Sequence, residues 1–164
     1  MRQAPERVSP LILMDPSARP DAPEQTERRK GLVAKAKTEG IGPVIEDLAP
    51  HFLAERHHDR ADLRESVNRM AEETGVDAFV RQQTAIMNRP DSRPSLAAIS
   101  CPTLVIVGDE DALTPLDLAK EISSGVAGSR LEIIPRCGHL ATIEQPEAVN
   151  DAIKSFLEGA GISS

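Results

Sequence analysis

The stretch that decides the fold is Thr103–Asp111, TLVIVGDED. It begins with five apolar or β-branched residues, which is typical of a strand buried on both faces of a parallel sheet. A second apolar run, Leu131–Ile134, has the same character and is followed by Gly138 and His139. Between the two runs, Leu116–Ser123 predicts a crossover helix. We therefore expect two neighbouring parallel strands joined by a helix.

Asp111 and His139 lie in the loops that follow these two strands. The carboxyl ends of parallel strands meet at one edge of the sheet, where open α/β folds place their sites, so we expect the two side chains to lie together. An imidazole takes up and returns protons near neutral pH, and a carboxylate bound to Nδ1–H fixes its tautomer. Asp111 and His139 are therefore the candidate catalytic residues.

The sequence around this pair is similar to a known superfamily. Ile99–Asp111, followed by Thr114-Pro115, resembles the acid-bearing segment of the α/β-hydrolase superfamily. Gly138–Leu140 and Glu144–Glu147 resemble its histidine loop and the start of its last helix. The order of acid and then histidine also agrees with that fold.

The resemblance covers the whole chain and is strongest to the lipase, esterase and haloperoxidase-like members. It implies that Asp111, rather than Asp109, is the acid of a catalytic triad and that His139 is the general base. It also implies the fold class: α/β, the C-terminal part of an α/β-hydrolase fold, with about three parallel strands, flanking helices and a helical cap.

The chain divides into three parts along its length. Residues 1–15 contain an apolar run, Val8–Met14, that is expected to form a core strand and resembles the sixth strand of the superfamily. Residues 16–93 are expected to form the helical cap, and residues 94–164 the α/β core with both candidate residues. Apolar spacing predicts four short helices in the cap: Glu24–Thr38, Pro43–Glu55, Asp62–Thr74 and Val76–Asn88.

No Gly-x-Ser-x-Gly turn occurs in the 164 residues. In the superfamily, the nucleophilic serine and the oxyanion-hole donors precede the segments matched here. We therefore expect a serine-type hydrolase for esters or related carbonyl substrates, truncated before the nucleophile and inactive as an isolated chain. The alternative is a non-catalytic interaction or complementation module. It would associate through the exposed edge of Val8–Met14, as a homodimer or with a partner chain.

Other candidate groups have simpler interpretations. Asp15 also follows a strand, but we interpret it as a cap for the proline-rich loop after it. Cys137 is too close in sequence to His139 to act as its nucleophile and is expected to fill space in the core. Four further side chains lack the recurrent spacing of a zinc site, so we expect no metal and no cofactor: His51, His57, His58 and Asp59.

The composition excludes several classes of partner. A net charge of −7 is the wrong sign for binding nucleic acid or an anionic membrane, and three Phe with no Trp or Tyr leave few stacking platforms for bases. No apolar stretch reaches the length of a membrane helix, and no targeting segment is recognisable. The two cysteines are expected to be free thiols. We expect a cytoplasmic protein whose partner, once complemented, is a small ester-like substrate.

Overall fold

The computed structural model describes residues 1 and 3–161 and divides into two compact units. Unit 1 consists of Met1–Ala18, His51–Arg56 and Ser92–Ser164, and unit 2 of Arg19–Pro50 and His57–Asp91. The two units are described separately below.

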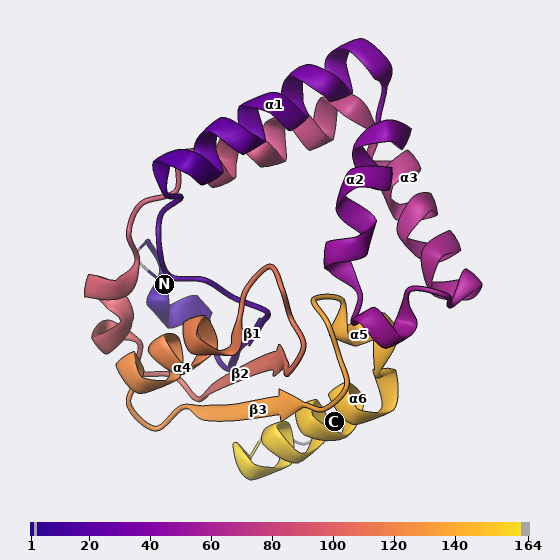
Figure 1. Ribbon diagram of the computed structural model, residues 1–164. Helices are drawn as coiled ribbons and strands as arrows, with labels where there is room; N and C mark the ends of the chain where they lie inside the picture. The colour runs from indigo at the N-terminus through magenta and orange to yellow at the C-terminus, as the bar shows by residue number, and fades with distance from the viewer. Residues whose placement is uncertain (2, 162–164) are drawn as a thin grey trace. The chain divides into compact units, whose positions relative to one another are not determined.

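Unit 1 is built on a sheet of three parallel strands, as predicted, and their order is β1-β2-β3 (Figure 1). The strands are β1 (Leu11–Met14), β2 (Thr103–Gly108) and β3 (Arg130–Ile134). Leu13 is in register with Val105 on β2. The helix α4 (Leu116–Gly125) forms the crossover from β2 to β3. Because all three strands are parallel, their carboxyl ends lie at one edge of the sheet.

The first strand is shorter than the sequence predicts. The first strand begins at Leu11 rather than Val8, because Pro5–Arg7 forms a short 3-10 helix (η1) and Pro10 has no N–H to donate. Leu11 is the first residue that bonds to the neighbouring strand, through its N–H and the carbonyl of Pro102. Helix α4 begins at Leu116, as predicted, and the hydroxyl of Thr114 just before it donates to Asp111.

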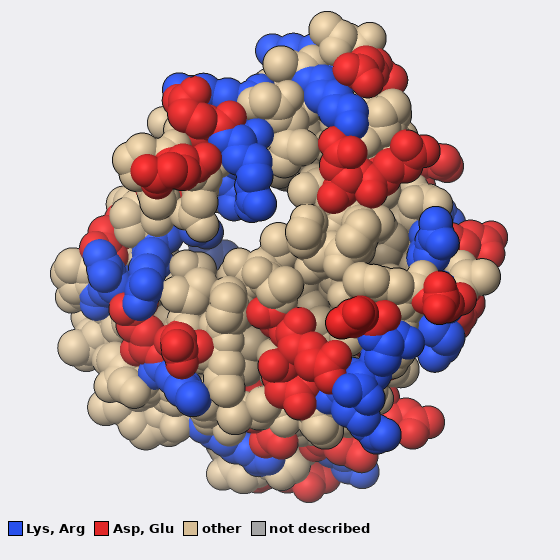
Figure 2. All heavy atoms as spheres, in the orientation of Figure 1, with Lys and Arg blue, Asp and Glu red and all other residues tan. Residues whose placement is uncertain are grey.

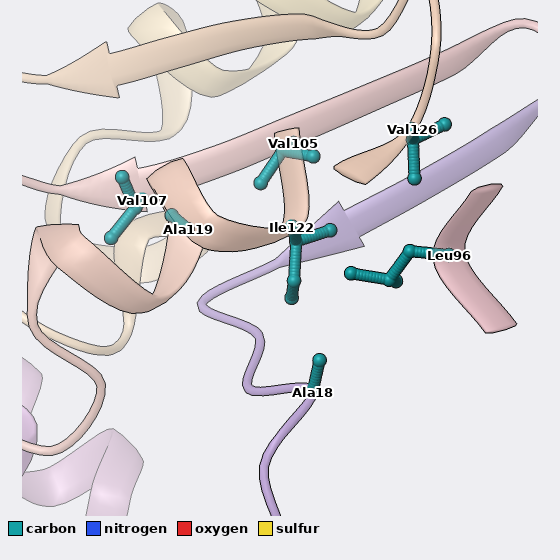
Figure 3. Close-up of a cluster of buried hydrophobic side chains, with 7 residues drawn as sticks. All are labelled: Ala18, Leu96, Val105, Val107, Ala119, Ile122 and Val126. Carbon is teal, nitrogen blue, oxygen red and sulfur yellow. The ribbon is translucent and has the colours of Figure 1, made fainter. Parts of the chain in front are cut away.

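Helices cover both faces of the sheet, and β2 supplies side chains to both. Val105 and Val107 face α4 and the 3-10 helix η3 (Arg93–Ala98) in one buried cluster (Figure 3). That cluster is completed by Ala18, Leu96, Ala119, Ile122 and Val126. Leu104 and Ile106 face the other way and pack with Val149 and Phe156 of α6 (Pro146–Gly159). This burial on both faces explains the unbroken apolar run of β2.

Unit 2 is helical and has its own small core. It contains α1 (Pro23–Glu39), most of α2 (Gly42–Phe52) and α3 (Ala61–Met87). The short 3-10 helix η2 (Glu55–His57) precedes α3. The core is formed by three buried side chains, Ala36, Val44 and Phe79.

The third helix of unit 2 contains a break that the sequence marks. Gly75 has a φ of 67°, outside the helical range, so α3 consists of two helical segments. The sequence predicts separate helices at Asp62–Thr74 and Val76–Asn88, and the break falls at the residue between them. A positive φ is unfavourable for residues with a Cβ, which explains why a glycine stands here.

The surface of the protein carries charges of both signs. Figure 2 shows Asp and Glu side chains interspersed with Lys and Arg over the visible face. Some of these groups form ion pairs within one unit, such as Arg56 with Glu110 in unit 1 and Lys35 with Asp47 in unit 2. Over the described residues, none of the helices combines the length and the apolar character needed to cross a bilayer.

Candidate active site

The structure brings Asp111 and His139 into direct contact. Asp111 lies in the loop after β2 and His139 in the loop after β3, and His139 Nδ1 is 2.9 Å from Asp111 Oδ2. An ionised carboxylate can only accept hydrogen bonds, so the proton of this bond belongs to Nδ1. The imidazole then keeps Nε2 for proton exchange with another group.

Asp111 is held by its own loop as well as by the histidine. Its side chain is fully buried, and Oδ1 accepts the backbone N–H groups of Leu113 (2.8 Å) and Thr114 (2.9 Å). Oδ2 accepts the Thr114 hydroxyl at 2.6 Å and the His139 ring. Burial alone would raise the pKa of Asp111, but the hydrogen bonds from His139 and Thr114 outweigh it and lower the pKa below 3.8. The carboxylate is therefore charged at neutral pH.

The pKa of His139 is shifted in the opposite direction to that of Asp111. Its side chain is 26% exposed, and burial on its own would lower the pKa of the imidazole. The hydrogen bond and charge of Asp111, with the nearby charges of Asp15 and Glu144, reverse this and raise the pKa above 6.5. The ring is thereby stabilised in the protonated form that a general base acquires during catalysis.

Gly108 allows the acid and histidine loops to pack backbone to backbone. A Cβ on Gly108 would overlap the carbonyl oxygens of Cys137 and Gly138. At this contact the N–H of Glu110 donates to the Cys137 carbonyl at 2.9 Å. Asp109 is not in contact with the histidine ring; its carboxylate accepts the Cys137 N–H at 3.2 Å. Asp109 therefore fixes the two loops to each other, while Asp111 contacts His139.

Asp15, at the end of β1, also lies beside Asp111 and His139. Its carboxylate oxygen Oδ1 accepts the Gly108 N–H at 3.2 Å. One ligand atom each from Asp15, Asp111 and His139 lies within 4.8 Å of the other two. Burial raises the pKa of Asp15 to about 7. Its position at the carboxyl end of a third parallel strand brings Asp15 to the same edge of the sheet as the pair.

These three residues also form a group of possible metal ligands, but several of their donor atoms already form hydrogen bonds. Both oxygens of Asp111 accept hydrogen bonds, and Nδ1 of His139 is used in one of them. A cation would have to displace this network, so the donor set suits proton transfer better than metal binding. Within the described residues, the histidines at positions 51, 57 and 58 are not part of any such group.

Cys137 has the surroundings of a core residue. Its side chain is completely buried beside Ile134 and Ala141, and burial raises the pKa of the thiol. A thiol that resists ionisation is a poor nucleophile. Both cysteines, Cys101 and Cys137, are free, as the sequence predicts.

The sequence of the chain is similar to one family model and to known hydrolases. The sequence model described as the Ndr family matches residues 2–164. A 2-hydroxy-6-oxononadienedioate/2-hydroxy-6-oxononatrienedioate hydrolase from Klebsiella pneumoniae is 32% identical over 166 aligned residues. The alignment covers 95% of this chain and 56% of that hydrolase, so the chain spans little more than half of its relative.

Solved structures extend the similarity to the fold. A thermophilic esterase from Thermogutta terrifontis superimposes with a TM-score of 0.91 and 33% identity, over 97% of this chain and 59% of the esterase. The enol-lactonase from Burkholderia xenovorans superimposes with a TM-score of 0.84 at 24% identity, over 95% of this chain and 58% of that enzyme, and supports the fold alone. The matched region is the C-terminal part of an α/β-hydrolase fold, as predicted.

Proposed function

The chain belongs to the Ndr family, within the α/β-hydrolase superfamily, and from this we propose that Asp111 and His139 supply the acid–base half of a serine-type hydrolase site. The observation that carries the proposal is the 2.9 Å contact between His139 Nδ1 and Asp111 Oδ2 at the carboxyl edge of the sheet. The opposite pKa shifts of the two groups, with the carboxyl lowered and the imidazole raised, support it.

The proposed mechanism uses His139 twice. In the first step Nε2 accepts the proton of a serine hydroxyl while the serine oxygen attacks the substrate carbonyl. The imidazolium then gives this proton to the leaving group as the tetrahedral intermediate collapses to an acyl-enzyme. In the second half Nε2 takes a proton from water as the water oxygen attacks the acyl carbon. The imidazolium then returns that proton to the serine oxygen as the acyl–serine bond breaks and the acid is released. Asp111 holds the ring and stabilises its charged form throughout.

We propose esters or related carbonyl compounds as the substrates. The support is the esterase from T. terrifontis and the oxononadienedioate hydrolase from K. pneumoniae among the similar proteins. The 164 residues contain no Gly-x-Ser-x-Gly turn, so the serine and the oxyanion-hole donors would come from polypeptide outside them. The proposal includes that residues 1–164 by themselves do not hydrolyse esters.

A chimera tests this function directly. Residues 1–164 would replace the matched region of the T. terrifontis esterase, so that the remainder of that protein precedes them. We expect hydrolysis of a short aryl ester and labelling by a fluorophosphonate probe. His139→Ala should reduce kcat/KM by about a thousandfold or more, and Asp111→Asn by a similar amount.

The control for the chimera is His58→Ala, which removes an imidazole outside the site and should leave kcat/KM unchanged. Residues 1–164 alone should be inactive with the same ester and probe. A folded, active chimera that is insensitive to His139→Ala would contradict the proposed role of the pair.

A second candidate function is a non-catalytic complementation module, and the position of β1 favours it. Within the described residues the sheet ends at β1, which pairs with β2 only, and Met14 at its end is 44% exposed. Such a strand can pair with a strand of a second polypeptide. Under this alternative the chimera folds but does not react with the probe, and residues 1–164 bind the nucleophile-bearing portion of the esterase when the two are mixed.

A further inference from the structure

Glu144 is a buried acidic residue that the proposed mechanism does not use. It ends the short helix α5 (Ala141–Glu144), five residues after His139, and is 7% exposed. Oε1 accepts the N–H of Gly138 at 2.9 Å, and Oε2 accepts the N–H of Ala54 at 2.8 Å. One carboxylate therefore joins the residue before His139 to a segment about ninety positions earlier in the chain.

The two segments that Glu144 joins are also in direct backbone contact. The carbonyl of Phe52 accepts the N–H of His139 at 2.9 Å and the N–H of Leu140 at 3.2 Å. A Cβ on Gly138 would lie 2.5 Å from the Ala54 nitrogen. The backbone on both sides of the histidine is thus held by groups outside its own loop, and Glu144 closes this arrangement.

The same segment is fixed to the acid loop as well. Arg56 forms a two-pronged ion pair with Glu110, the residue before Asp111, with Nε 3.1 Å and Nη2 2.5 Å from Oε1. Residues 52–56 therefore touch both loops of the candidate site. The Arg56–Glu110 pair is partly exposed, whereas the carboxylate of Glu144 is buried, and a buried hydrogen-bonded carboxylate is costly to disrupt.

We propose that Glu144 is a positioning residue, which holds Gly138 and Ala54 together so that the His139 ring meets Asp111. This inference rests on the proposed function, because it assigns the Glu144 carboxylate a role in positioning the Asp111–His139 pair. Glu144 acts through the backbone and does not contact the reacting groups. A neutral amide of the same size would present an NH2 to one of two backbone donors and lose one of the two hydrogen bonds.

The experiment is a side-chain NMR titration of residues 1–164, which needs neither nucleophile nor substrate. The imidazole signals of the four histidines are followed with pH, and the spectrum of His139→Gln identifies His139. In the native chain we expect a raised His139 pKa and a downfield Nδ1–H resonance. Glu144→Gln should lower that pKa by about half a pH unit or more and weaken the resonance.

Two further variants separate positioning from charge. Glu144→Asp keeps the charge but is one methylene shorter and cannot reach both donors, so it should weaken the Nδ1–H resonance as Glu144→Gln does. Glu147→Gln removes an exposed charge from α6 and should leave His139 as in the native chain. Folded Glu144 variants with a native His139 pKa and resonance would overturn the proposal.

A measurement on the native chain covers the case in which the variants do not fold. The amide protons of Gly138 and Ala54 should exchange slowly and with similar protection, because one carboxylate holds both. Rapid exchange of either amide would overturn the proposal. Asp111→Asn distinguishes failure of this inference from failure of the proposed function. If Asp111→Asn leaves the His139 pKa unchanged, Asp111 does not act on His139 and the proposed function is wrong.

Discussion

Asp15 and Asp111 are two identical side chains at one site whose surroundings shift their pKa values in opposite directions. Asp111 accepts four hydrogen bonds, which outweigh its burial and lower its pKa. Asp15 accepts a hydrogen bond from the N–H of Gly108, and burial raises its pKa to about 7. At neutral pH the site therefore holds one firmly ionised carboxylate and one that is close to its titration midpoint.

The shift of Asp15 predicts a pH-dependent effect of Asp15→Asn. A pKa raised from 3.8 to about 7 stabilises the fold below about pH 4, and this contribution is lost as the pH rises to 7. The side chain of Asn in the variant Asp15→Asn does not ionise, so the variant does not lose this stability as the pH rises. The free energy of unfolding of the variant, relative to the native chain, should therefore increase between pH 5 and 8. The expected gain is about 1 to 2 kcal/mol, less than the full linkage value because the group is partly exposed.

Urea denaturation at several pH values measures this difference. Asp62→Asn is the control, because the ion pair with Arg60 lowers the pKa of Asp62 to about 2 and the group stays ionised over this range. Its effect on stability should be the same at pH 5 and pH 8. If the effect of Asp15→Asn on the free energy of unfolding were also the same at pH 5 and pH 8, the raised pKa of Asp15 would be contradicted.

Gly138 gives a second prediction at the scale of single residues. Its Cβ position lies 2.5 Å from the Ala54 nitrogen and 2.7 Å from the Leu53 carbonyl carbon, and both are backbone atoms. Gly138→Ala should destabilise the protein by about 2 to 3 kcal/mol, at the upper end of the usual cost of overpacking. Thermal unfolding would measure it, and an unchanged midpoint would show that residues 53–54 can move away.

The sequence predicts the contact between Asp111 and His139, because each follows a strand and the topology brings parallel strand ends together. It does not predict the approach of Asp15. That approach depends on a backbone φ of 47° at Asp15 and on the register of β1 against β2, neither of which leaves a pattern in the sequence. The hydrogen bond between Glu144 and Ala54 is not predicted either, because a contact between residues ninety positions apart leaves no pattern in the sequence.

At the scale of elements, hydrophobic pattern and helix-breaking residues predict most of the boundaries. The last helix, Pro146–Gly159, shows this, because a proline starts it and a glycine ends it. The first strand is shorter than its apolar run, since pairing rather than hydrophobicity defines a strand and Pro10 cannot donate. Periodicity indicates which segments are buried, whereas hydrogen bonds decide where each element begins.

Replacing glycine by alanine should have opposite effects on stability at Gly31 and at Gly75. Both positions have open space around the added Cβ, but Gly31 lies within α1 and Gly75 has a φ of 67°. Gly31→Ala should raise the free energy of unfolding by about 0.5 to 1 kcal/mol. Gly75→Ala should lower it by about 1 to 2 kcal/mol, because the left-handed conformation is unfavourable for alanine. Denaturant titration of both variants gives the comparison, and a stabilising Gly75→Ala would show that α3 straightens.

At the scale of the whole molecule, the edge of the sheet at β1 predicts association. Strand edges with apolar side chains pair with other strands unless charge or a covering segment blocks them. Light scattering of residues 1–164 should show a mass that increases with protein concentration. Met14→Lys should shift this equilibrium toward the monomer by about tenfold, equivalent to about 1.4 kcal/mol.

Met70→Lys is the matched control, because Met70 is 41% exposed and lies on α3 of unit 2, outside the sheet. It should not change the association. A native chain that remains monomeric at all concentrations would remove the support for pairing through β1 and with it the complementation alternative.

The order of the strands also affects how the protein is made. Strand β1 ends at Met14, but β2, its neighbour in the sheet, does not begin until Thr103. At about 5 to 20 residues per second, a ribosome needs several seconds to synthesise the intervening chain. During that time β1 is part of the nascent polypeptide, but β2 has not yet been synthesised. The pairing of β1 with β2 can form only after Gly108 has been synthesised.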